Sequence, residues 1–214
     1  MSVLRQPGVL GRTRRQHVLG ATAALSAGAV ETVSVGVWFV LAVGSRTTTT
    51  ALLGAAVLVG GALLRTRIVA AVVEGRRLRR GPRWVGLSLA VAAAWICWLL
   101  LAEAVDSPPG PIVATGLLGA ALSAQFALEQ AACRSRSADA DRLAAVVPGL
   151  LLALGAGLLL WAAWVPDWTL TTPPLSLGIT TVVVRIEPLQ LGVLGFGVLA
   201  AFAHQRRFQR LLES

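Results

Sequence analysis

Six stretches of the sequence are apolar over the length that crosses a lipid bilayer, and this feature limits the chain to few folds. A helix rises 1.5 Å per residue, so about 20 apolar residues span a hydrocarbon core of ~30 Å. A helix also pairs all its backbone groups within one segment, as a membrane interior demands. We therefore predict an all-α, polytopic membrane protein whose six transmembrane helices form one bundle over residues 18–204. The predicted segments are Val18 to Val43, Thr49 to Val73, Trp84 to Val105, Ile112 to Cys133, Leu143 to Val165 and Leu189 to Ala203.

The last segment is short. Its length of about 15 residues covers only ~22 Å, so we expect it either to begin earlier, near Thr180, or to enter from a dipped membrane surface. Residues 205–214 are predicted to form a cytoplasmic C-terminal tail.

Composition agrees with a membrane protein. The chain is 56% hydrophobic and 14% charged, with a mean hydropathy of +0.73, which is too apolar for an ordinary soluble domain. The net charge of +9 would suggest nucleic acid as the partner of a soluble protein, but here the charges lie at the ends of the apolar segments. We therefore predict the lipid bilayer as a partner and no nucleic acid.

The basic residues, all of them arginines, are distributed unequally between the two sides. Seventeen fall before the first segment, after the last, in the second and fourth connections or at the adjoining end of the second segment, while only Arg46 and Arg185 fall on the other side. Positive charge concentrates in the cytoplasm, so we expect a plasma membrane protein with both termini cytoplasmic and an Arg-rich N-terminus at residues 1–17. The inner arginines are Arg5, Arg12, Arg14, Arg15, Arg65, Arg67, Arg76, Arg77, Arg79, Arg80, Arg83, Arg134, Arg136, Arg142, Arg206, Arg207 and Arg210.

An alternative interpretation of the N-terminus is a secretory signal with a twin arginine, Arg14 and Arg15, and a cleavage site near Ala27 to Ala29. Cleavage there would leave a first segment too short to span the membrane. The five remaining segments would then place the C-terminal arginines on the non-cytoplasmic side. We favour an uncleaved first helix.

Glu31 is the residue that an apolar segment least explains. It lies near the middle of the first segment, too deep for its side chain to reach water, so it must be protonated, paired or placed in a wet cavity. Three interpretations stay open: a hydrogen bond that holds two helices together, a proton, cation or substrate contact, and a shifted helix that brings Glu31 to an interface. In the first two, Glu31 faces the bundle interior.

Four further residues could form a polar site with Glu31. Arg65 would lean toward the depth of Glu31 from the second segment, although we favour the simpler alternative in which Arg65 and Arg67 reach lipid phosphates. Gln125 and Glu129 share a helix face in the fourth segment. His204 lies at a similar depth in the sixth, where we favour an interfacial position in an amphipathic tail.

The connection from Pro166 to Pro188 is the least membrane-like long segment. Its β-branched run favours extended structure, and Arg185 and Glu187 would share one face of a strand. We expect an ordered surface strand or cap at residues 166–188 that packs against the outer face, with a re-entrant half-span as the alternative.

The even-numbered segments carry similar stretches that begin at Leu52, Leu117 and Val193 and align without gaps. This similarity would fit three helical hairpins around a threefold axis. Because Leu, Gly and Ala dominate every segment, we favour chance similarity.

No motif in the sequence indicates an enzyme. There is no Gly-rich phosphate loop and no nucleophile set, and Cys97 and Cys133 lack metal-ligand spacing. We expect no catalytic residues, no cofactor and no metal.

Two function classes remain. The first is a transporter or permease component for a small solute or ion, with Glu31 in the bundle interior. The second is a non-catalytic anchoring or scaffold subunit of a membrane complex. The partners in either case would be the bilayer and other membrane subunits or further copies of the chain.

Overall fold

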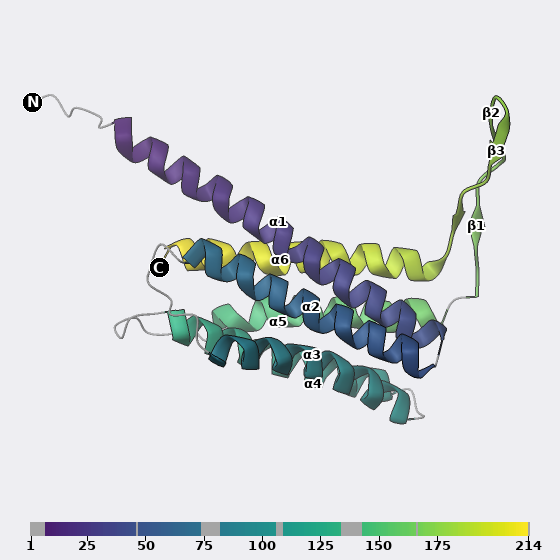
Figure 1. Ribbon diagram of the computed structural model, residues 1–214, viewed down its shortest axis with the longest axis horizontal. Coiled ribbons are helices and arrows are strands. Elements are labelled where there is room, and N and C mark those ends of the chain that lie inside the picture. The colour runs from purple at the N-terminus through teal and green to yellow at the C-terminus, as the bar shows by residue number, and fades with distance from the viewer. Residues whose placement is uncertain are drawn as a thin grey trace, which may run out of the picture.

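The protein is a bundle of long apolar helices with one small strand ribbon at its end (Figure 1). The computed structural model describes residues 7–45, 47–73, 82–105, 109–133, 143–165 and 167–213. In these ranges six helices are long and apolar enough to cross a membrane, with apolar spans of 19 to 27 residues. They are α1 (Pro7–Gly44), α2 (Thr48–Val73), α3 (Pro82–Ala104), α4 (Pro109–Cys133), α5 (Leu143–Trp164) and α6 (Pro188–Glu213).

Local signals set where these helices begin. Several start at a proline, including Pro82, Pro109 and Pro188, because the first helical position needs no backbone N–H and suits the fixed φ of proline. Helix α2 instead follows Thr47, whose Oγ1 accepts the backbone N–H of Thr50 at 3.2 Å. The Thr50 hydroxyl in turn accepts the Thr47 N–H at 3.3 Å, so the two threonines cap the helix reciprocally.

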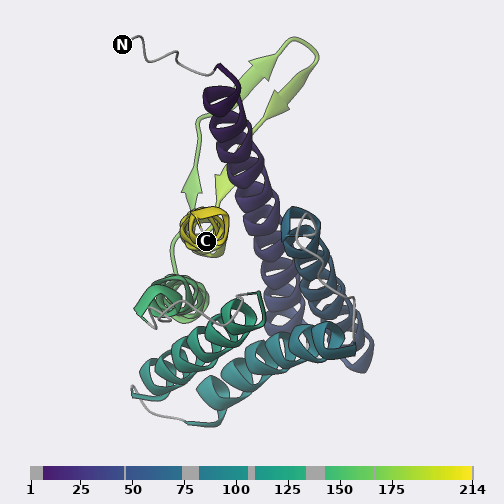
Figure 2. The same cartoon turned by 90° about the vertical axis from the view of Figure 1, so that its left-hand side faces the viewer.

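The helices form a closed ring. Each packs mainly against its neighbours in the chain, and α1 packs against α6 to complete the circuit, as the end-on view shows (Figure 2). The contact between α1 and α6 is close at Gly28, where a Cβ atom would lie 3.0 Å from the Cα of Ala201. Glycine at this position therefore lets the first and last helices meet backbone to backbone.

Aromatic side chains fill the ring on the side of the strand ribbon. Trp95 stacks edge to face on Trp98 and Phe196, with ring centroids 5.5 Å and 5.6 Å apart, and Phe39 lies 6.0 Å from Trp98. Edge-to-face packing of this kind is favourable beyond the buried area alone. This half of the interior is a packed aromatic core.

The connection after α5 forms a two-part antiparallel ribbon. Strand β1 (Leu170–Thr171) pairs with β4 (Arg185–Ile186), and β2 (Leu175–Leu177) pairs with β3 (Thr180–Val182). Gly178 makes the turn with a φ of 76°, a value that glycine adopts without strain. As expected for a strand, Arg185 and Glu187 approach each other, at 3.9 Å.

The ribbon does not cover the bundle as the sequence led us to expect. It projects beyond the helix ends (Figure 1), and Val182, Val183, Val184 and Ile179 remain exposed. Strand pairing within the connection gives backbone groups of its four strands partners, so extended structure forms here without packing on the helices.

Helices α1 and α6 extend furthest past their predicted limits. Helix α6 begins at Pro188, not near Thr180, and continues to Glu213, so the predicted end at residue 203 is too early. Its polar turn at His204 and Arg207 is buried against other helices, which a search for apolar runs cannot detect. Helix α1 begins at Pro7, before the predicted start at Val18, and its first turns extend beyond the other helices (Figure 1).

Candidate functional site

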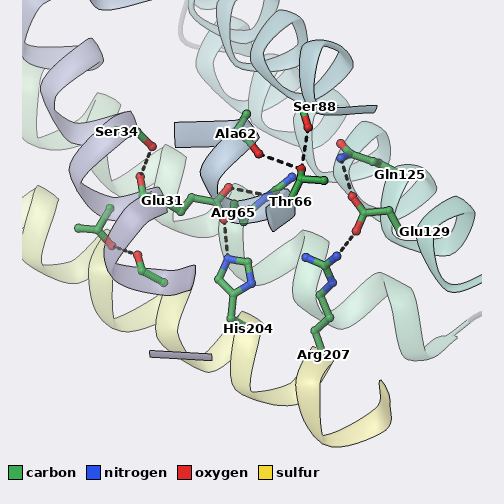
Figure 3. A network of polar contacts seen from close by, with 12 residues as sticks. Glu31, Ser34, Ala62, Arg65, Thr66, Ser88, Gln125, Glu129, His204 and Arg207 are labelled. Atoms are coloured by element: carbon green, nitrogen blue, oxygen red, sulfur yellow. Dashed lines mark hydrogen bonds and ion pairs between the residues drawn. The ribbon is translucent and has the colours of Figure 1, made fainter. Parts of the chain in front are cut away.

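Glu31 lies in the bundle interior and is paired with two other helices. Its side chain is only 3% exposed. Oε1 and Oε2 lie 3.2 Å and 3.3 Å from Nη1 of Arg65 on α2, and Oε2 also lies 2.6 Å from Nε2 of His204 on α6 (Figure 3). The buried carboxylate therefore has a cation and an imidazole as partners, as a charge at this depth requires.

The antiparallel packing of α1 against its two neighbours explains this convergence. Side chains lean toward the N-terminus of their own helix, so residues on antiparallel helices lean toward one another in depth. Our preference for lipid-facing Arg65 and interfacial His204 was wrong, because both side chains are buried. Arg67, two positions further along α2, is exposed.

A second buried ion pair joins α4 to α6. Arg207 Nη2 donates to Oε2 of Glu129, and Nε2 of Gln125 donates to Oε1 of the same carboxylate at 3.0 Å. Gln125, Glu129 and Arg207 are all buried. The polar site predicted from the sequence is thus a set of mutually paired side chains in the interior.

The ring of Phe126 lies between the two ion pairs. The guanidinium carbon of Arg65 is 5.9 Å from the ring centroid and that of Arg207 is 5.0 Å away. Cations at such distances are attracted by the ring quadrupole. Phe126 therefore connects the two pairs into one network, which we call the interior network: Glu31, Arg65, Gln125, Phe126, Glu129, His204 and Arg207.

Smaller polar groups tie α3 and the backbone of α1 to this region. The hydroxyls of Thr66 on α2 and Ser88 on α3 lie 2.6 Å apart, and Ser34 donates to the carbonyl oxygen of Glu31 at 3.2 Å. A Cβ atom on Gly61 would overlap the Ser34 side chain. Glycine at position 61 therefore permits α2 to approach α1 beside Glu31.

Several buried nitrogen atoms in and beside the interior network have no hydrogen-bond partner. Among the described residues, buried nitrogen atoms without a hydrogen-bond partner are Arg65 Nη2, Trp95 Nε1, His204 Nδ1 and Arg207 Nη1. Native proteins pair the large majority of buried polar atoms. Four such atoms in one region of the interior therefore require an explanation beyond packing.

A small pocket adjoins these groups between α1, α2 and α3. Glu31 and Arg65 form its polar wall, and Trp95 closes it toward the aromatic core. Its free space holds roughly one water-sized species. The full lining is Glu31, Ser34, Val35, Leu58, Gly61, Ala62, Arg65, Val91 and Trp95.

Sequence reasoning missed Arg207, Phe126 and Trp95. Arg207 was counted only as an inner-side charge, although it lies three positions after His204 and so shares its helix face. Phe126 likewise lies three positions before Glu129 and shares its helix face. This spacing was the sequence signal that could have identified it. Trp95 offered no signal separate from the other tryptophans of its segment.

The charges of the interior network balance when His204 is neutral. Two carboxylates face two guanidinium groups, and neither pair is exposed to water. Burial of each ion alone would cost several kcal/mol, so each ion depends on its partner in the pair. The His204 imidazole contacts Glu31 through Nε2, and its Nδ1 makes no hydrogen bond. Among the described residues no group of three or more His, Cys, Asp or Glu side chains is arranged to hold a metal ion.

Comparison of the chain with protein-family models, with curated proteins and with solved structures finds no match.

Proposed function

We propose that this chain is a small membrane transporter, or the permease component of one, for a small solute or ion, and that the interior network with its pocket is the substrate and coupling site. The carrying observation is the pair of buried donors without a partner, Arg65 Nη2 and Trp95 Nε1, on residues that line a pocket together with Glu31. Ionisable residues inside a membrane are costly and mark substrate or proton pathways. A network that served only to hold helices together would gain from pairing every donor.

The second candidate is an anchoring or scaffold subunit, in which the interior network holds the helices together. The dense aromatic cluster around Trp95, Trp98 and Phe196 supports it, because that half of the ring is filled with side chains. The two candidates differ in whether water reaches the pocket in the working protein.

Cysteine accessibility separates them. In a variant with Cys97 and Cys133 replaced by Ser, Leu58→Cys places a thiol on the pocket, and Leu122→Cys places one in the buried core of α4. A transporter that opens its site should react at position 58 with a small, charged thiol reagent, whereas position 122 should stay unreacted. If both stay unreacted and a stoichiometric protein partner co-purifies in mild detergent, the result supports the scaffold function and contradicts transport.

The orientation in the plasma membrane belongs to the same proposal. The arginine asymmetry supports cytoplasmic termini and an external ribbon, with Arg46 and the connections at 74–81 and 134–142 outside the described residues. Thr171→Cys on β1 should then react with an impermeant reagent added outside intact cells, while Gly81→Cys should react only after lysis. Labelling of Gly81→Cys in intact cells contradicts this topology.

A further inference from the structure

The ribbon between α5 and α6 begins and ends at one boundary of the bundle. The apolar span of α5 ends at Trp164 and that of α6 starts at Pro188, so both ends of the ribbon lie where these spans leave the hydrocarbon core. Trp164 and Trp168 are 43% and 40% exposed there, and tryptophan is enriched at the headgroup level of a bilayer. The base of the ribbon therefore lies at the depth of a membrane–water interface.

The ribbon stays at this depth along its length. It runs crosswise to α6 in Figure 1, and the view along the helices shows it extending sideways from the bundle (Figure 2). Helices that span a bilayer run close to its normal, so a segment crosswise to them lies parallel to the membrane surface. A hairpin that entered the surrounding water would instead continue in the direction of the helices.

The side chains of the ribbon suit a lipid interface better than they suit water. Ile179 at the tip is fully exposed, and Val182, Val183 and Val184 are each at least 40% exposed. From residue 168 to residue 184 the sequence has no charged side chain. An apolar, uncharged ribbon that stayed in water would be open to aggregation, whereas the boundary between headgroups and acyl chains accepts apolar side chains.

The backbone limits how deep the ribbon can lie. Each of its two sheets has two strands, so the outer edges of this described connection carry N–H and C=O groups that no further strand pairs. Such groups do not enter the hydrocarbon core in contact with lipid. The exposed ion pair of Arg185 with Glu187, at 3.9 Å, also requires water. The headgroup region supplies water to these groups and apolar contact to the valines.

We infer that the ribbon over residues 168–186 lies flat in the headgroup region of the bilayer, where Trp168 holds its base and Ile179 holds its tip. The partner of this surface is the lipid interface, and not a second copy of the chain or a soluble protein. The contact does not depend on the proposed function, since it would form in a transporter and in a scaffold alike. It fixes the start of α6, the helix that carries His204 and Arg207, at the membrane surface.

Electron paramagnetic resonance of a nitroxide at position 179 tests the inference. Ile179→Cys is spin-labelled in a variant with Cys97 and Cys133 replaced by Ser, and is reconstituted into vesicles of phosphatidylcholine and phosphatidylglycerol. Because Ile179 is fully exposed, the label does not disturb packing. Its collisions with oxygen, which concentrates in hydrocarbon, are compared with its collisions with a water-soluble nickel chelate. We expect the label to meet both reagents, at a ratio between those of the lipid core and of water.

Leu154→Cys in the same background is the control for depth. Leu154 is 59% exposed near the middle of the α5 span, so its label should collide mainly with oxygen. A label at position 179 that collides mainly with the nickel chelate places the ribbon in water and overturns the inference. A ratio equal to that of Leu154→Cys places the tip in the hydrocarbon core, and a label that neither reagent reaches is covered by protein. Each of these results also overturns the inference.

Two tryptophan variants provide a matched pair. Trp168→Ala removes the aromatic ring at the base of the ribbon and should raise the nickel collision rate at position 179, because the ribbon loses an interfacial anchor. Trp161→Ala removes a ring that is 54% exposed within α5 and should leave that rate unchanged. Equal rates in the two variants overturn the role of Trp168 as the anchor of the ribbon.

Discussion

Replacement of Glu31 by Gln should destabilise the protein severely, because it removes the counter-charge of a buried cation. Arg65 is 2% exposed, and its only charged partner within hydrogen-bond distance among the described residues is Glu31, at 3.2 Å and 3.3 Å. The next carboxylate, Glu129, is already paired with Arg207. Loss of one partner of a buried ion pair costs about 3–5 kcal/mol, and a Gln amide restores one acceptor without restoring the charge.

The assay is equilibrium unfolding in mixed detergent micelles with increasing sodium dodecyl sulfate, monitored by tryptophan fluorescence. We expect Glu31→Gln and Arg65→Gln each to lower the unfolding free energy by about 3–5 kcal/mol, whereas the double variant should cost far less than their sum. The double variant carries a neutral, hydrogen-bonding pair, so the coupling energy in the mutant cycle should reach about 2–3 kcal/mol. Glu187→Gln is the control, since its pair with Arg185 is exposed and should contribute under about 1 kcal/mol. Additive single effects, or a Glu31→Gln variant as stable as the wild type, would refute the assignment of Glu31 as the charge partner of Arg65.

Two further predictions use neighbouring residues as their own controls. Arg207→Gln should lower the unfolding free energy by about 3–5 kcal/mol because it leaves Glu129 buried without a cation, while Arg206→Gln, on an exposed side chain, should change it by under about 0.5 kcal/mol; equal effects in the same unfolding assay would place Arg207 outside the interior network. Gly61→Ala should cost about 1–3 kcal/mol, because the new Cβ overlaps Ser34 and must push α2 from α1. Gly60→Ala meets nothing within 4 Å and should leave stability unchanged or slightly raised, so similar destabilisation by both variants would show that helix approach at Gly61 is not the cause.

Hydropathy alone predicted which segments form helices. It did not predict where the helices end or which polar side chains pair between them. Glu31 could be placed in the interior because an unpaired carboxylate in lipid is so unfavourable, and Arg65 could be suggested because both residues lean toward one depth. The favoured interpretation of Arg65 was nevertheless wrong, since helix order within the ring decides whether its side chain meets Glu31 or lipid. The same lack of spatial information ended α6 too early, because His204 and Arg207 look like the start of a solvated tail until Glu31 and Glu129 supply their partners.

The ribbon shows a different limit. A β-branched run predicted extended structure near Val182, and the structure has strands there. The pairing partners around Leu170 and Leu175 have no such signal in the sequence. The exposed position of the ribbon could not be foreseen, because burial of its valines depends on which surfaces lie within reach.

The closure of the helix ring between α1 and α6 has a consequence for how the chain is made. Synthesis proceeds from the N-terminus, so Glu31 and Glu129 enter the bilayer before His204 and Arg207 have left the ribosome. During that interval Arg65 is the one arginine of the interior network already synthesised, and Glu129 lacks its cationic partner, Arg207. A nascent chain that stalls before α6 therefore holds an uncompensated acid in an apolar segment, which is costly inside a membrane. Insertion of α6 ends this vulnerable period in a single step, since the same helix closes the ring, supplies Arg207 to Glu129 and brings His204 to Glu31.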